Sequence, residues 1–307
     1  MTIIDRETVL NKIKLGYSFK QAELSRLNLA DANIDGASFS ESYMRGAILV
    51  RASCRKTNFK STNLMFADLS HANLSQANLE RTELNSATLN HAILNDANGY
   101  KIQLFSSKLN DVKAININLS LADLRQASGT DVYFIGANLS KAFLEKTRFK
   151  QVNFERATIT NARFQGASIN DSRWHKANLQ NTNFTKTNIT NADFIDASLV
   201  NSKFIQAQLD TVNFTEAELL EADFRNAQLT QINFTDSTLL SANLEGAKLT
   251  KIDLTNTNLQ DANFENTTWH NVTFDNCNVH GAVFSDAKGL TDEQKQWLKK
   301  NGALNVT

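Results

Sequence analysis

The sequence predicts an all-β chain wound into a parallel coil with four flat sides, and three observations support this prediction. First, nearly every residue from Phe19 to Phe284 whose number ends in 4 or 9 is Leu, Phe, Ile or another large apolar residue, and Ala, Ser or Thr precedes most of them by two positions. Second, a longer pattern repeats every twenty residues. Third, the chain contains no proline, which would remove a hydrogen bond from a strand ladder.

The five-residue period excludes one continuous helix or one straight strand. On an α-helix a step of five residues drifts by about 140°, so the large residues would wind around the helix. On a strand an odd step places successive large residues on opposite faces. The chain must therefore turn a corner once in five residues, so that the large residue and the small one both point inward.

The twenty-residue period predicts the number of sides. From Phe154 to Phe234 the large positions alternate between aromatic and aliphatic residues. Val or Ile enlarges small positions that lie at multiples of twenty from one another, whereas Ala or Ser occupies most of the positions ten away; the enlarged ones are Val112, Val132, Val152, Val212, Ile232, Ile252 and Val272. We expect four sides of five residues, with Phe stacked on two opposite sides and Leu or Ile on the other two.

The repeated units resemble the pentapeptide-repeat family, whose motif centres on Ala-(Asp/Asn)-Leu. The clearest copies are Ala67-Asp68-Leu69, Ala72-Asn73-Leu74, Ala77-Asn78-Leu79, Ala137-Asn138-Leu139, Ala192-Asp193-Phe194 and Ala262-Asn263-Phe264. The resemblance covers about 265 residues, because about 53 successive units keep one phase. It implies a right-handed quadrilateral parallel β-helix, a pentapeptide-repeat solenoid of about 13 coils. The handedness comes from the resemblance alone.

Short helical caps are expected at both ends, where a stack of strands would otherwise expose unpaired backbone. The stretch from Asp5 to Leu15 has helical apolar spacing, and Thr291 to Gln294 form a capping box that opens a helix ending near Gly302. A partner-binding or export segment is the alternative. The expected organisation is an N-terminal cap over 1–18, a β-helix over 19–287, and a C-terminal helical cap and tail over 288–307.

Little in the sequence indicates catalysis, and we expect neither enzymatic activity nor a cofactor. No phosphate-binding loop, metal-ligand spacing or nucleophile elbow occurs, and a loopless four-sided coil offers no deep pocket. His71 and His91 share an outward column with Asp111 and Asp131, so a metal site is conceivable. A solvated polar column is favoured, and no metal is expected.

The two cysteines, Cys54 and Cys277, fall at inward positions about eleven coils apart and cannot pair. Buried reduced thiols are expected, and with no signal-like or membrane-spanning run the sequence favours a reducing cytoplasm, bacterial on the resemblance. Delivery by a secretion system is the alternative.

The formal net charge of zero hides two segments of opposite charge. Residues 41–176 hold 18 basic and 11 acidic residues, and residues 208–287 hold three basic and twelve acidic ones. The candidate acidic surface consists of Asp210, Glu216, Glu218, Glu221, Asp223, Asp236, Glu245, Asp253, Asp261, Glu265, Asp275 and Asp286. Some members of the family bind DNA gyrase or topoisomerase IV as mimics of a DNA duplex. Four acidic coils form only a short track, and direct nucleic-acid binding is not expected.

An apolar set on the outside of the coil is the candidate interface. Val200, Leu220 and Leu240 fall in one outward column, and Ile195 and Ile205 occupy nearby columns. Stacked apolar residues on a flat wall favour association with a partner or a second copy, so a homodimer is conceivable. The alternative is that these side chains fold along the wall.

A defect interrupts the repeat where three large positions are too small: Gly99, Ala114 and Gly129. Neighbouring small positions are enlarged there, which favours compensatory packing; an altered cross-section that marks a binding region is the alternative.

The function expected from the sequence is therefore a non-enzymatic protein-interaction rod, with an effector or a secretion-system component as possible settings on the resemblance. The alternative is a DNA-mimicking modulator of gyrase or topoisomerase IV that acts through the acidic coils.

Overall fold

Parallel bridges join residues twenty positions apart on each of the four sides of a coil. The computed structural model describes residues 5–307, and the N–H of Phe19 already donates to the carbonyl of Ser38 at 2.8 Å. One bridge lies on each side of the first coil: Ser18 to Ser38, Glu23 to Tyr43, Asn28 to Ile48, and Asn33 to Ser53. The four-sided parallel coil predicted from the two periods is confirmed.

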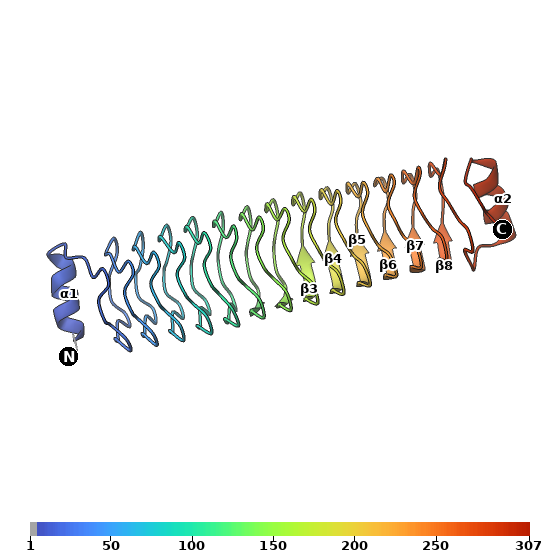
Figure 1. Ribbon diagram of the computed structural model, residues 1–307. Coiled ribbons are helices and arrows are strands. Elements are labelled where there is room, and N and C mark those ends of the chain that lie inside the picture. The colour runs from blue at the N-terminus through green and yellow to red at the C-terminus, as the bar shows by residue number, and fades with distance from the viewer. Residues whose placement is uncertain (1–4) are drawn as a thin grey trace. The chain divides into compact units, whose positions relative to one another are not determined.

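The chain divides into two compact units, Met1–Ala157 and Thr158–Thr307. In the first unit, helix α1 (Arg6–Lys14) precedes the coils (Figure 1). Strand β1 (Ser128–Thr130) pairs with β2 (Arg148–Lys150). Residues 1–4, which belong to the expected 1–18 cap, lie outside the described part of the chain.

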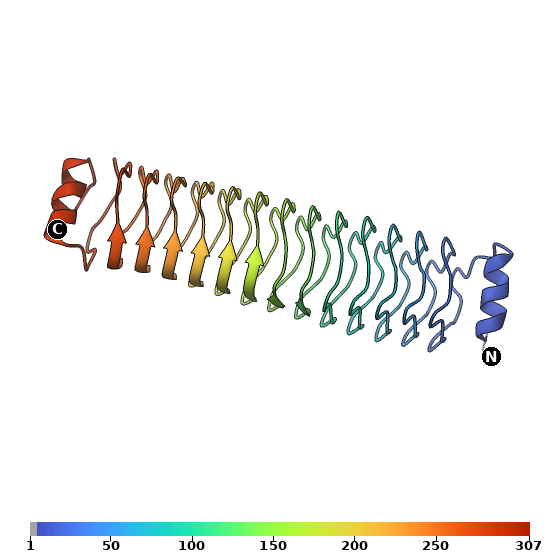
Figure 2. The same cartoon turned by 180° about the vertical axis from the view of Figure 1, so that it is seen from behind.

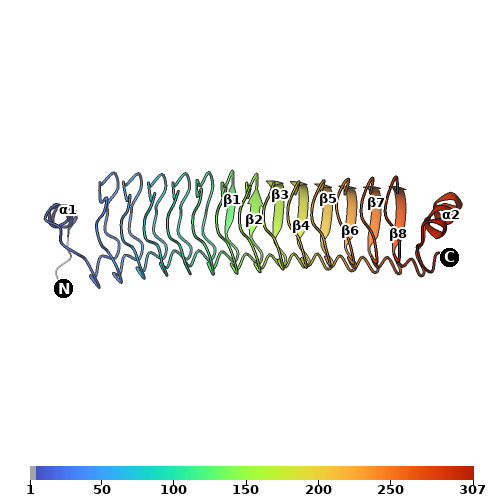
Figure 3. The same ribbon diagram turned by 90° about the horizontal axis from the view of Figure 1, so that it is seen from above.

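The second unit carries six longer strands on one side of its coils. They are β3 (Ser168–Arg173), β4 (Asn188–Asp193), β5 (Gln208–Asn213), β6 (Gln228–Asn233), β7 (Lys248–Asp253) and β8 (Thr268–Thr273). Each pairs in parallel with the next at a register of twenty, and Figures 2 and 3 show the six arrows side by side and pointing the same way. Helix α2 (Asp292–Lys300) follows β8.

Regular strands form on fewer coils than the thirteen that the repeat predicts. Within residues 5–307, β1 and β2 lie on successive turns of the first unit, β3 to β8 lie on successive turns of the second, and isolated bridges join the other sides within each unit. Each longer strand continues through a corner onto the next side, where β5, β6 and β7 hold the enlarged positions Val212, Ile232 and Ile252. Strands β3 and β4 are equally long although they hold Ser172 and Ala192 at this position, so the enlarged residues do not determine strand length.

Every corner contains a residue in the left-handed backbone region. The corners hold residues whose numbers end in 0 and 1 or in 5 and 6, and the second residue of each pair has a positive φ, such as 58° at Gln21 and 57° at Thr211. At most corners a turn hydrogen bond closes the bend, as from the Ala22 N–H to the Phe19 carbonyl at 3.1 Å. These corners turn the chain so that the large residue of each side points inward.

Aromatic residues form two stacks inside the second unit, as the alternation predicted. Phe184, Phe204 and Phe224 stack with ring centroids 4.9 and 4.8 Å apart. Phe214 belongs to the second stack and meets Phe204 edge to face at 6.1 Å. These rings are fully buried, so the two stacks fill the space between opposite sides.

Both expected helices form. Asp5 caps α1 by accepting a hydrogen bond from the Thr8 N–H at 2.8 Å, and Val9 is fully buried. At α2 the predicted capping box between Thr291 and Gln294 is present. After α2 the chain turns back, and the N–H of Leu304 donates to the carbonyl of Ala282 at 2.7 Å. None of the helices among residues 5–307 is long and apolar enough to cross a membrane.

Candidate interaction surfaces

The register of twenty stacks outward residues in columns along each corner. The N–H of Asn201 donates to the carbonyl of Leu220, and the N–H of Glu221 donates to the carbonyl of Leu240, both at 2.9 Å. The structure therefore brings Val200, Leu220 and Leu240 together at one corner on successive coils. We call these three residues the apolar column.

The apolar column is half-buried and bounded by polar residues. Val200, Leu220 and Leu240 each keep part of their surface exposed, and Gln180 and Gln260 occupy the same corner one coil before and one coil after. On the adjoining position of this corner lie the exposed residues Asn201, Glu221 and Ser241. An apolar centre with a polar rim is the arrangement typical of a protein interface.

Ile195 and Ile205 do not join the apolar column. They occupy the corners before and after Val200 on the same coil, and both are half-buried. The candidate interface therefore consists of one continuous column with two separate apolar residues beside it.

The acidic residues of the second unit divide among all four corners. The corner of Glu221 also holds Asp261, the next corner holds Glu245, Glu265 and Asp286, the third holds Asp210, and the fourth holds Glu216, Asp236 and Asp275; Asp223, Asp253 and Glu218 lie between corners. Glu245, Glu265 and Asp286 follow one another at one corner, but the other nine acidic residues lie elsewhere, so no single corner of this unit gathers most of the charge.

Part of this charge is also engaged locally. Arg225 lies beside Asp223, with Nη2 2.7 Å from Oδ2, and this contact raises the pKa of the Arg225 guanidinium. Hydrogen bonds from the hydroxyl and N–H of Thr255 lower the pKa of Asp253. The acidic segment therefore presents dispersed, partly paired carboxylates.

The two stacked histidines belong to a polar column of the first unit. The rings of His71 and His91 stack with centroids 4.4 Å apart, and His91 Nδ1 lies 3.4 Å from Asp111 Oδ2. One coil earlier, Arg51 forms a two-pronged ion pair with Asp31 at 2.7 and 2.8 Å, which lowers the pKa of Asp31. Within residues 5–307 no group of three or more His, Cys, Asp or Glu is placed to hold a metal ion.

At the repeat defect, neighbouring side chains occupy the space of the missing large residues. A Cβ on Gly129 would lie only 2.6 Å from Val132 Cγ2 and 2.8 Å from the Leu109 carbonyl oxygen, and one on Gly99 would lie 3.3 Å from Ile102 Cγ2. Ala114 is buried, and its N–H donates to the Tyr133 carbonyl at 2.9 Å. The hydrogen-bond ladder therefore continues through the defect.

Sequence reasoning missed a more exposed apolar group in the first unit. Tyr43, Ile48 and Phe66 are 54%, 39% and 51% exposed, and Arg45 Cζ lies 4.5 Å from the centre of the Phe66 ring. The available signal was Phe66 itself, an aromatic residue at a left-handed corner position where the chain often uses Asn, Asp or Gly.

Both cysteines are buried free thiols. Burial raises the pKa of each thiol, to about 12 for Cys277, whose Sγ–H donates to the Leu254 carbonyl at 2.8 Å.

Four-sided parallel coils that stack the residues of successive repeats in columns define a solenoid repeat protein. A family model described as pentapeptide repeat region matches residues 127–204 and 184–254, and another, pentapeptide repeats in eight copies, matches 28–64, 62–98, 107–145 and 252–288. Together these matches cover more than half of the chain. The chain belongs to the pentapeptide-repeat family.

Solved structures of similar fold include a trypsin-treated form of QnrB1, a plasmid-mediated fluoroquinolone resistance protein (20% identity, 64% of this chain and 88% of that chain, TM-score 0.45). HetL, a pentapeptide repeat protein involved in heterocyst differentiation regulation from the cyanobacterium Nostoc sp. strain PCC 7120, matches at 22% identity over 92% and 97%, with a TM-score of 0.24. A pentapeptide repeat protein from the Arabidopsis thaliana thylakoid lumen matches at 33% over 38% and 77%, with a TM-score of 0.21. A comparison with curated protein sequences finds no match.

Proposed function

We propose that this chain is a non-enzymatic protein-interaction β-helix whose second unit binds a protein partner through the apolar column. The observation that carries the proposal is the stacking of Val200, Leu220 and Leu240 on successive coils, within a rim of polar residues. The inter-coil hydrogen bonds hold these side chains at fixed spacing, so binding requires little ordering of the β-helix. Each Leu that a partner covers contributes roughly 1–2 kcal/mol, because it is already half-buried.

The test compares partner recovery by the full chain and by charged variants. Leu220→Glu and Leu240→Glu place a carboxylate in the column and should together reduce recovery of a cross-linked partner at least about tenfold. Thr230→Glu is the matched control, because Thr230 is also half-buried and occupies the opposite corner of the Leu220 coil. Equal recovery by all forms would remove the apolar column from the interface.

A second copy of the chain is one form that the partner could take. Light scattering on the same variants separates the cases: a mass that falls with Leu220→Glu assigns the column to self-association, and an unchanged mass with lost recovery assigns it to another protein. Partner recovery by a Tyr43→Glu/Phe66→Glu variant tests separately whether the exposed residues of the first unit contribute to binding.

The alternative, a DNA-mimicking modulator of gyrase or topoisomerase IV, draws only on the acidic composition of residues 208–287. Division of the carboxylates among four corners favours the interaction surface over the mimic. Supercoiling by gyrase at micromolar protein, with and without a quinolone, decides the matter, and a change in either activity or drug sensitivity would restore the mimic.

A further inference from the structure

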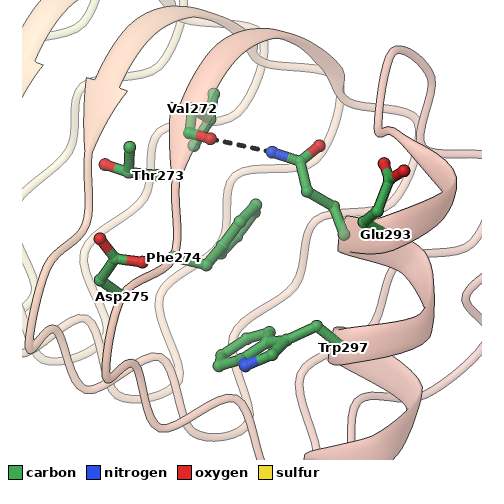
Figure 4. Close-up of a pocket in the computed structure, with 7 residues that line it drawn as sticks. Val272, Thr273, Phe274, Asp275, Glu293 and Trp297 are labelled. Carbon is green, nitrogen blue, oxygen red and sulfur yellow. Dashed lines mark hydrogen bonds between the residues drawn. The ribbon is translucent and has the colours of Figure 1, made fainter.

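A cavity of about 360 Å³ lies between the last complete coil of the second unit and helix α2. Figure 4 shows Phe274 from the coil and Trp297 from α2 beside the cavity, with Asp275 and Glu293 on either side of the rings. The two ring centroids are 6.1 Å apart. The cavity is therefore open, apolar at its centre and acidic at its margins.

The cavity exists because the hydrogen-bond ladder ends there. In the preceding coils the N–H of Phe234 donates to Asp253 and that of Leu254 donates to Thr273, at 2.8 and 3.3 Å. The next partner in register with Phe274 would be Glu293, which already belongs to α2. The N–H groups of Phe274 and Asn276 accordingly have no hydrogen-bond partner among residues 5–307.

Helix α2 provides a hydrogen-bond partner for one backbone group at this edge of the coil, the Val272 carbonyl. The Gln294 side chain donates from Nε2 to the Val272 carbonyl at 2.9 Å, as Figure 4 shows. Phe274 is buried, and a buried N–H group without a partner is costly, so this group favours a ligand that supplies a carbonyl oxygen. Asn276 is exposed, and its N–H is free to donate to the same ligand. An added extended strand would supply carbonyl oxygens in the same way as a further coil.

The side chains around the cavity favour a cation. Aromatic faces attract ammonium and guanidinium groups, most strongly when water is excluded. The lining includes the carboxylates of Asp275 and Glu293 and no basic residue. The pKa of Glu293 is lowered by hydrogen bonds from its own N–H and the Thr291 hydroxyl, so it is ionised at neutral pH.

We propose that this cavity binds an extended segment of a partner protein that inserts an arginine or lysine side chain. The cationic group lies against Phe274 and Trp297 and pairs with Asp275 and Glu293, while carbonyls of the segment accept hydrogen bonds from Phe274 and Asn276. The volume is at the lower end of those of ligand sites, which suits one side chain with its adjoining backbone. This site is separate from the apolar column and goes beyond the proposed function.

The test titrates the full chain with two capped seven-residue peptides that differ only at the centre, Arg in one and Gln in the other. Calorimetry gives the affinity and tryptophan fluorescence the location, because Trp174 and Trp269 are buried whereas Trp297 is half-exposed. The Arg peptide should bind at least tenfold more tightly than the Gln peptide. Equal affinities, or no binding at millimolar peptide, would overturn the proposal.

Variants locate the site. Asp275→Asn/Glu293→Gln should weaken the Arg peptide at least tenfold, whereas Asp286→Asn, at an exposed corner outside the cavity lining, should leave it unchanged. Trp297→Leu should abolish the fluorescence response, and Trp297→Phe, which preserves more of the packing of α2, should give an intermediate affinity. Unaltered binding by the double variant contradicts the site.

Amide hydrogen exchange tests the main-chain part. The Phe274 and Asn276 amides should gain protection with the Arg peptide, and unchanged exchange would refute strand addition. Leu220→Glu should bind the peptide normally, so this proposal and the proposed function can fail independently.

Discussion

Thr211 occupies a left-handed corner, with φ 57°, although β-branched residues are strained in this region. On two other coils the same corner position is Asn, namely Asn191 and Asn271. Asn tolerates a positive φ well. The corners thus include residues that adopt the left-handed conformation easily and others, such as Thr211, whose strain there lowers the stability of the fold.

Replacement of Thr211 by Asn should therefore stabilise the protein by about 0.5–1 kcal/mol, because the strain at one corner is relieved. Urea unfolding followed by circular dichroism measures the shift in midpoint. The reciprocal change Asn191→Thr is the control and should lower the midpoint. A lower midpoint for Thr211→Asn would mean that the hydrogen bond of its hydroxyl to Asp210 matters more than the strain.

Position 129 requires glycine because the Val132 side chain occupies the space that a Cβ would need. Gly129→Ala should destabilise the protein by about 1–3 kcal/mol, because the new Cβ meets Val132 and the Leu109 carbonyl. Adding Val132→Ala should recover part of this loss by removing the clash with Cγ2. A double-mutant cycle from denaturation curves measures the coupling, and purely additive effects would show that Val132 does not compensate for the glycine.

The Cys277 thiol should be nearly inert in the folded protein. Its pKa of about 12 leaves roughly a thousandfold less thiolate at pH 8 than a thiol of ordinary pKa near 9. Iodoacetamide labelling, read by mass spectrometry, should be slow in buffer and rapid in urea. Because the folded pKa is the higher one, this thiol stabilises the fold below about pH 9 and loses that contribution as pH rises toward 12. Rapid labelling of the native protein would contradict the burial.

At the scale of the element, the aromatic stacks couple each coil to the next. Phe204→Ala removes a ring that lies between Phe184 and Phe224 and should cost about 3–5 kcal/mol, whereas Phe204→Leu should cost clearly less. Thermal unfolding compares the two. Similar losses for both variants would contradict this expectation and indicate that stacking of the aromatic ring, and not the filled volume, determines stability at this position.

The sequence predicted the four-sided coil and its helical caps better than the extent of the strands or the cavity beside α2. The periods of five and twenty predicted the inward residues and four sides, and the Thr291 capping box predicted α2, because these patterns are local. The extent of the strands could not be predicted, because six-residue strands form alike over Ser172, Ala192 and Val212. The terminal cavity could not be predicted, since it depends on where α2 leaves the ladder beside Phe274. The three-residue apolar column was predicted, but its half-buried state depends on how the side chains lie against the corner.

At the scale of the whole molecule, each coil depends on its neighbours, so stability is sensitive to how the last coil is covered. Deleting residues 289–307 removes α2 and the Leu304 pairing with Ala282 and Phe284. The uncovered edge should associate with other copies. Light scattering should show a mass that rises with concentration, and Thr291→Ala, which keeps the segment, is the control. A truncated chain with the mass of one copy at all concentrations would refute this role.

The corners also give the chain two different counting rules for changes in length. An insertion of five residues preserves the order of small and large inward residues, yet it moves every following outward residue to the next corner. An insertion of twenty preserves both. One extra pentapeptide between Leu220 and Leu240 would therefore divide the apolar column and keep a large residue inward on every side, although Phe would then stack on Leu or Ile. Changes in repeat number can thus rearrange the outer columns of such a protein at the cost of its aromatic stacks.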